Sequence, residues 1–189
     1  MLEKYFKGLA EQVAIPFIRI CIYLKIKPNT LSFLGLLIVI SGCYLIFIDY
    51  TDIGLLILFL GLAVDGLDGP LARNTSQITE IGSFIDSIID RVTEMFIWCL
   101  FCIKFVNSDV EILLSFLILT GSFLIPYIRA KSESLNIKNT IGLTPRPERI
   151  IFAIIYMAIT PEIIYLYIFT ALIWVTVFQR SIHLYRNLK

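Results

Sequence analysis

Long apolar stretches alternate with short polar segments along this chain of 189 residues. The first apolar stretch, residues 31–48, is close to the roughly 20 residues that a helix needs to cross a bilayer. The pattern predicts an all-α integral membrane protein with six transmembrane helices. The later apolar stretches cover residues 53–64 (continuing through a polar motif at 65–73), 81–105, 112–128, 146–160 and 163–184.

Residues 1–26 precede the first predicted span and mix apolar with charged positions at helical spacing. Such a mixture is typical of an amphipathic segment that lies on the membrane surface. Pro16 should kink this segment, because proline cannot continue a helical hydrogen-bond ladder. Residues 27–189 are predicted to form the six-helix core. Together with the surface segment they make residues 1–189 a single predicted membrane domain.

The composition agrees with a membrane protein. Hydrophobic residues make up 58% of the chain and the mean hydropathy is +0.84. Charged residues make up 16%, against about 25% in a typical soluble domain. The formal net charge of +1 gives no indication of a nucleic-acid partner, so membrane lipid is the expected surrounding.

The charged residues are divided unevenly between the two predicted faces. Six spans place both termini on one side, and every Lys and Arg except Lys104 falls on that side. Acids such as Asp49, Asp109 and Glu162 fall on the other side. Because an excess of Lys and Arg marks the cytoplasmic side, we expect a multi-pass protein of the cell (plasma) membrane with its termini in the cytoplasm.

Four aspartates lie inside the second and third predicted spans: Asp65, Asp68, Asp86 and Asp90. Ionisable side chains are costly in a bilayer and usually mark a functional site. The first two are three residues apart and the last two are four apart, so each pair shares one face of its helix. At 1.5 Å per residue both pairs lie roughly 7–14 Å inside the helix ends. We therefore expect the carboxylates to converge on the cytoplasmic side.

Converging carboxylates repel one another in a low dielectric unless cations bind between them. An all-oxygen ligand set favours Mg²⁺ or Mn²⁺, and two such ions suit phosphoryl transfer. Gly66, Gly69 and Gly82 allow close approach of a ligand to the backbone, and Arg73 can pair with a phosphate. Spacing alone leaves a second interpretation open, a cation transporter with a carboxylate-lined path.

The full motif resembles the signature of the CDP-alcohol phosphotransferase (CDP-alcohol phosphatidyltransferase) family. The resemblance implies an enzyme of phospholipid biosynthesis that moves a phosphatidyl-type group from a CDP-linked lipid to an alcohol and releases CMP. It also implies a homodimer. The residues that carry it are Asp65-x-x-Asp68-Gly69-x-x-Ala72-Arg73, eight further residues, and then Gly82-x-x-x-Asp86-x-x-x-Asp90.

The resemblance implies a role for each motif position. Asp65, Asp68 and Asp86 would be metal ligands, and Asp90 would be the general base and a ligand of the second metal ion. The positions implied to bind the CDP-lipid are Asn29, Thr30, Gly69, Ala72, Arg73, Thr79 and Gly82. For Asn29 and Thr30 the alternative is a helix N-cap after Pro28.

Residues 127–135 and 142–149 resemble the branch of the family that includes the phosphatidylinositol phosphate and archaetidylinositol phosphate synthases. Asn136 departs from this branch, where glycine is more usual. Arg146 and Arg149 share a helix face, and with Arg129 and Lys131 they are predicted to bind the acceptor's phosphate. The alternative is that these cations are ordinary cytoplasmic anchors.

The branch implies inositol 1-phosphate as the acceptor and CDP-diacylglycerol or CDP-archaeol as the donor. Glycerol 3-phosphate, serine and another inositol-containing alcohol remain alternative acceptors.

Overall fold

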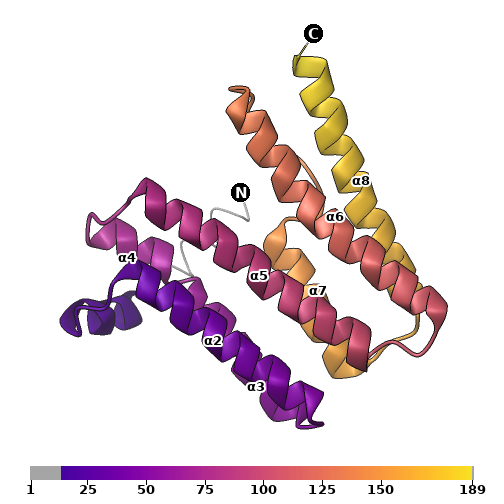
Figure 1. The fold of residues 1–189 in the computed structure, drawn as a ribbon, viewed down its shortest axis with the longest axis horizontal. Coiled ribbons are helices and arrows are strands. Elements are labelled where there is room, and N and C mark those ends of the chain that lie inside the picture. Colours follow the sequence, from indigo (N-terminus) through magenta and orange to yellow (C-terminus); the bar gives the residue numbers. More distant parts are fainter. Residues whose placement is uncertain (1–13, 189) are drawn as a thin grey trace. The chain divides into compact units, whose positions relative to one another are not determined.

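The computed structural model describes residues 14–188, and all regular structure in that range is helical, without a strand (Figure 1). The all-α prediction is therefore confirmed. The helices form two compact units, of which the first ends at Thr93 and the second begins at Glu94. After a helix over Ala14–Tyr23 come α2 (Pro28–Phe47), α3 (Thr51–Asp65), α4 (Asp68–Asn74), α5 (Glu80–Lys104), α6 (Asp109–Ser134), α7 (Arg146–Ile159) and α8 (Ile164–Asn187).

Four helical stretches are long and apolar enough to cross a membrane: Pro28–Phe47, Thr51–Asn74, Asp109–Ser134 and Ile164–Asn187. Two predicted spans are not among them. The span predicted at residues 81–105 corresponds to α5, which carries several charged residues, and the span predicted at 146–160 corresponds to α7, which has 14 residues. At 1.5 Å per residue α7 is about 21 Å long, less than the roughly 30 Å of a hydrocarbon core.

The helix over Ala14–Tyr23 lies in the predicted surface segment, of which residues 1–13 lie outside the described range. Ala14, Ile18 and Cys21 are spaced at one helical face and are buried against Leu31 and Leu71. Large apolar side chains on its other faces are exposed, as expected for a helix in contact with lipid. The segment thus packs onto the beginning of α2 and onto α4.

Helices α2 and α3 form a closely packed antiparallel pair in the first unit. Glycines line their contact: Gly35 and Gly42 of α2, and Gly54 and Gly61 of α3. A Cβ atom added at any of them would have an atom of the opposite helix within 3.0 Å. The pair can approach this closely only because these positions lack side chains.

The second predicted span is interrupted at the motif. Helix α3 ends at Asp65 and α4 begins at Asp68, with a turn at Gly66 and Leu67. Pro70 explains the break, since it has no N–H to donate to the carbonyl of Gly66 and its ring crowds that carbonyl. Asp65 and Asp68 consequently stand at the two sides of a bend.

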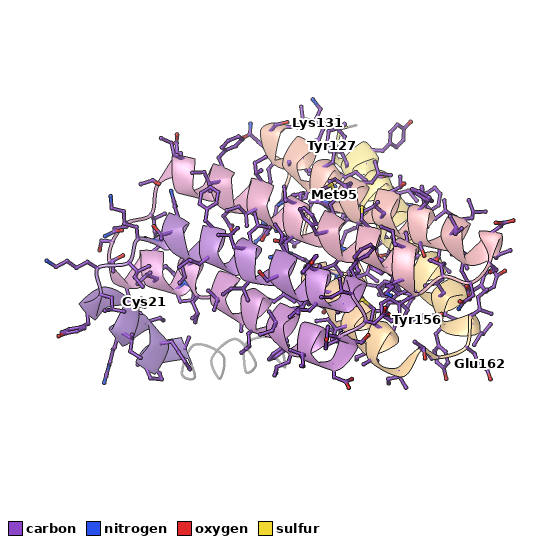
Figure 2. The ribbon with its side chains drawn as sticks, turned by 60° about the horizontal axis from the view of Figure 1, so that its bottom comes forward. Cys21, Met95, Tyr127, Lys131, Tyr156 and Glu162 are labelled. Atoms are coloured by element: carbon purple, nitrogen blue, oxygen red, sulfur yellow. The ribbon has the colours of Figure 1, made fainter. Side chains whose placement is uncertain are left out.

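In the second unit α6 and α8 run side by side in the same direction (Figure 1). A Cβ at Gly121 would lie 2.3 Å from Cγ2 of Ile173, and Nη1 of Arg180 donates to the carbonyl of Ile125 (3.0 Å). Figure 2 shows Lys131, near the end of α6, at one end of this unit and Glu162, between α7 and α8, at the other. The basic Lys131 and the acidic Glu162 therefore lie at opposite ends of the second unit.

The segment between α6 and α7 is fixed to α8. The backbone N–H groups of Leu143 and Thr144 donate to Oγ1 of Thr176 (3.1 and 3.2 Å). Helix α6 continues to Ser134 rather than ending near residue 128, and Asn136 follows in the left-handed conformation (φ 59°). Glycine adopts this conformation most easily and asparagine tolerates it, which accounts for the asparagine at a position where glycine is more usual.

Candidate active site

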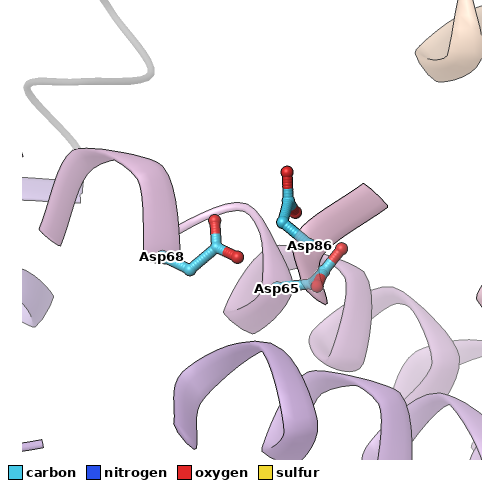
Figure 3. A group of neighbouring side chains, drawn as sticks. All are labelled: Asp65, Asp68 and Asp86. Carbon is cyan, nitrogen blue, oxygen red and sulfur yellow. The ribbon is translucent and has the colours of Figure 1, made fainter. Parts of the chain in front are cut away.

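Three of the four predicted aspartates form a cluster in the first unit. Asp65, Asp68 and Asp86 each offer a carboxylate oxygen, and these oxygens lie within 4.8 Å of one another. Figure 3 shows the three side chains gathered around one point. Asp65 is 4% exposed and the other two are half-buried. The bend between α3 and α4 positions the first two, and the first half of α5 supplies the third.

The carboxylates of this cluster match the requirements of a divalent cation. Two unit charges about 4.8 Å apart repel by about 3.5 kcal/mol at an effective dielectric constant of about 20, so three together are unfavourable without a counter-ion. Carboxylate oxygens are hard ligands, which suit Mg²⁺ or Mn²⁺ rather than zinc. The residues therefore fit a divalent metal ion.

Asp90 lies one helical turn beyond Asp86 on α5 and is not one of the three clustered residues. Its Oδ2 is 3.8 Å from Nη1 of Arg91, and its side chain is 19% exposed. Nη1 of Arg91 also donates to the carbonyl of Ser87 (2.8 Å). The expected convergence thus holds for three aspartates, and the predicted roles of Asp90 as base and as metal ligand stay predictions.

A cavity of about 260 Å³ adjoins the cluster, because Asp68 and Asp86 both line it. Six of the positions predicted to bind the CDP-lipid also line this cavity, whereas Thr30 is exposed and does not. The six are Asn29, Gly69, Ala72, Arg73, Thr79 and Gly82.

The alternative of an N-cap at Asn29 or Thr30 is wrong. Helix α2 begins at Pro28, so Lys27 is its N-cap residue, and no side chain caps the helix there. Asn29 instead faces Gly82: a Cβ at Gly82 would lie 3.3 Å from Oδ1 of Asn29 and 3.0 Å from Oγ1 of Thr79. The glycine therefore leaves open the space between these two polar side chains.

Sequence reasoning did not identify Ser32, which lines the same cavity. Its hydroxyl donates to Oδ2 of Asp68 (2.5 Å), and the residue is 2% exposed. Ser32 belongs to the motif Pro28-Asn29-Thr30-Leu31-Ser32 at the start of α2. Only its contact with Asp68, 36 positions away, distinguishes it from other serines near a helix start.

The four cations predicted to bind an acceptor lie in the second unit. Arg129 donates to Oε1 of Glu133 (2.8 Å) in an exposed i,i+4 pair. Lys131 is exposed near the end of α6, and Arg146 is half-buried at the start of α7. The charges of Arg129 and Arg149 both act on Arg180 of α8. The sequence did not identify Arg180 as a candidate for binding the acceptor.

Arg149 differs from the other three because its side chain is buried. It is 2% exposed. Its Nε and Nη2 donate to the two carboxylate oxygens of Glu94 (2.6 and 2.9 Å), and its Nη1 donates to the carbonyl of Thr144 (2.9 Å). The predicted contact between Arg149 and an acceptor phosphate stays a prediction, and Glu94 is a competing partner for the guanidinium.

A model of the CDP-alcohol phosphatidyltransferase family matches residues 25–180. The chain is 30% identical over 182 residues to an uncharacterized protein of Aquifex aeolicus, covering 95% of this chain and 93% of that protein. It is 35% identical over 161 residues to an archaetidylinositol phosphate synthase of Pyrococcus horikoshii, covering 83% and 82% of the two chains.

Crystal structures of Mycobacterium tuberculosis phosphatidylinositol phosphate synthase share the fold. The structure with CDP-DAG bound has a TM-score of 0.82 at 21% identity, covering 92% of this chain and 94% of that one. The complex with manganese and citrate has a TM-score of 0.81 at 20% identity, covering 91% and 88%. Since the family model spans most of its length, this protein is a transferase of the CDP-alcohol phosphatidyltransferase family.

Proposed function

We propose that this protein transfers the phosphatidyl or archaetidyl group of a CDP-linked lipid to inositol 1-phosphate and releases CMP. The observation that carries the proposal is the cavity in the first unit, which is lined both by two of the clustered carboxylates, Asp68 and Asp86, and by the motif's small residues. The archaetidylinositol phosphate synthase relative supports the choice of acceptor. Family membership leaves the alternative of a cation transporter without support.

The donor's diphosphate and nucleotide would occupy the cavity lined by Asn29, Ala72 and Arg73. Gly69 and Gly82 leave room for it, since a side chain at either position would extend toward Arg73 or toward Asn29. Arg73 supplies a permanent positive charge for a phosphate. The lipid tails, of CDP-diacylglycerol or CDP-archaeol, would remain among the apolar helix surfaces.

Asp65, Asp68 and Asp86 would hold Mg²⁺ or Mn²⁺, with Asp90 contributing to a second ion. When bound, such ions would supply positive charge to offset that of the diphosphate and of the departing CMP. Asp90 accepts the proton of the acceptor hydroxyl. The hydroxyl oxygen then forms a bond to the β-phosphorus, and the bond from that phosphorus to the CMP oxygen breaks.

The acceptor's phosphate would be bound by Arg129, Lys131 and Arg146. A phosphate favours arginine because the guanidinium donates two parallel hydrogen bonds. For Arg149, the fourth cation, we propose a structural role in place of the predicted phosphate contact: it pairs with Glu94 in the first turn of α7, which begins at Arg146.

The proposed setting is a multi-pass protein of the plasma membrane with six spans, α5 and α7 included, and the site on the cytoplasmic side. For the second unit, the separation of Lys131 from Glu162 supports a cytoplasmic position of the end that carries Lys131 (Figure 2). We also propose that the two units together make one membrane domain and that the protein is a homodimer, as the family resemblance implies.

The test is CMP release by the purified full-length protein with one CDP-lipid, Mg²⁺ and a panel of acceptors. Inositol 1-phosphate should support release, whereas glycerol 3-phosphate, serine and free inositol should not. The Asp90→Asn variant should retain CDP-lipid binding and lose turnover. Full turnover in this variant would refute the assigned base, and preference for another acceptor would refute the assigned substrate.

A further inference from the structure

Helix α2 contributes no predicted metal ligand, yet one turn of it contacts two of the three clustered aspartates. Ser32 contacts the carboxylate of Asp68, and Gly35 lies so close to Asp65 that an added Cβ would meet the backbone and Cβ of Asp65. Both α2 residues are buried. We infer that Ser32 and Gly35 are positioning residues, which set the geometry of the metal centre on which the proposed function rests.

Ser32 fixes the orientation of the Asp68 carboxylate. Its hydroxyl has one proton, and the 2.5 Å distance to Oδ2 of Asp68 is that of a charge-assisted bond, whereas the carbonyl of Pro28 lies 3.3 Å away. The other oxygen, Oδ1, accepts the N–H of Gly69. With both oxygens held, the carboxylate cannot rotate freely, and such outer contacts typically alter metal affinity by about 10- to 100-fold.

Gly35 fixes the position of Asp65 along the other side of the turn. A Cβ at Gly35 would lie 2.9 Å from both Cβ and N of Asp65 and 3.0 Å from its Cα. Ordinary carbon contacts begin at about 3.5 Å, and a rotamer change cannot relieve a contact with backbone. An added methyl group therefore displaces the first metal ligand itself.

The same helix offers matched controls. A Cβ at Gly42 would lie 2.6 Å from N and 2.9 Å from Cα of Leu58, so Gly42→Ala strains the same helix pair. It does so seven residues from Gly35, about 10 Å along the axis. Ser41 is an exposed serine of α2 whose hydroxyl donates to the carbonyl of Leu37 (2.9 Å), so Ser41→Ala matches Ser32→Ala.

The experiment is a Mn²⁺ titration of the purified full-length protein in detergent without substrates, followed by electron paramagnetic resonance. Ser32→Ala and Gly35→Ala should each weaken Mn²⁺ binding by about 10-fold or more. Ser41→Ala and Gly42→Ala should bind Mn²⁺ as the wild type does, even where Gly42→Ala lowers the melting temperature. In turnover assays excess metal should restore much of the activity of Ser32→Ala.

Two results would overturn the inference while leaving the proposed function intact. One is wild-type Mn²⁺ affinity in both Ser32→Ala and Gly35→Ala. The other is an equal loss of affinity in Gly35→Ala and Gly42→Ala, which would mean that general packing of the helix pair, not the position of Asp65, controls the site. A wild-type protein that binds no Mn²⁺ or Mg²⁺ would overturn the proposed metal centre and this inference with it.

Discussion

The ion pair between Glu94 and Arg149 gives a prediction that separates a structural role from a substrate-binding role. Both side chains are almost fully buried, at 5% and 2% exposure, and are joined by two hydrogen bonds. Arg149→Met leaves the Glu94 carboxylate buried without its partner, which should cost about 3–5 kcal/mol of unfolding free energy. The double variant Glu94→Leu/Arg149→Met removes both charges at similar volume and should recover most of that loss.

The assay is equilibrium unfolding of the purified protein in detergent, with Arg129→Met as the control. Arg129 and Glu133 are more than half exposed, so breaking their pair should cost less than about 1 kcal/mol. An Arg149→Met protein as stable as the control would refute a stabilising role for the buried pair. For the stable double variant we expect an acceptor KM close to that of the wild type. A KM raised about tenfold, which corresponds to about 1.4 kcal/mol, would instead mean that Arg149 binds the acceptor directly.

Three further predictions concern the site and its supports. Asp86→Asn should weaken Mn²⁺ binding at least about 10-fold, and chelation of the metal should stop CMP release by the wild type until Mg²⁺ or Mn²⁺ is returned. Gly82→Ala should raise the KM for the CDP-lipid about tenfold, since overpacking costs about 1–3 kcal/mol, while an unchanged KM would contradict the cavity assignment. Gly142→Ala should destabilise the protein by about 1–3 kcal/mol, because φ of Gly142 is +132° and the added Cβ would lie 2.4 Å from Cγ2 of Thr176. Gly66→Ala is the control in the same unfolding assay, because the Cβ added there would have no atom nearer than 3.5 Å.

Much of the metal cluster was predictable because its geometry is local. Spacings of three and four residues place side chains on one helix face, and equal depth along two connected helices brings the faces together. The cause of the bend at Gly66 and Leu67 is also local, since Pro70 lies only three residues after Leu67. Asp90 is the exception. Helical spacing puts it on the same face of α5 as Asp86 but one turn further along the helix, and that extra turn leaves it outside the group of three.

Contacts between residues distant in the chain could not be predicted. Gly35 and Gly42 read in the sequence as unremarkable glycines of an apolar span, and only the register of α2 against α3 shows that Gly35 meets Asp65. Glu94 and Arg149 are 55 residues apart, so charge patterning suggested a cytoplasmic arginine where the structure has a buried pair. The register of two packed helices depends on side-chain fit along their whole length, which local spacing does not encode.

The measurement that tests the central claim most directly is the mass of the lipid product formed from one CDP-lipid and inositol 1-phosphate in the presence of Mg²⁺. We predict a lipid that retains the donor's tails and carries an inositol phosphate headgroup, formed together with CMP and absent when the metal is chelated. A product lacking the acceptor's own phosphate, or no lipid product with inositol 1-phosphate while glycerol 3-phosphate or serine is consumed, would contradict the account.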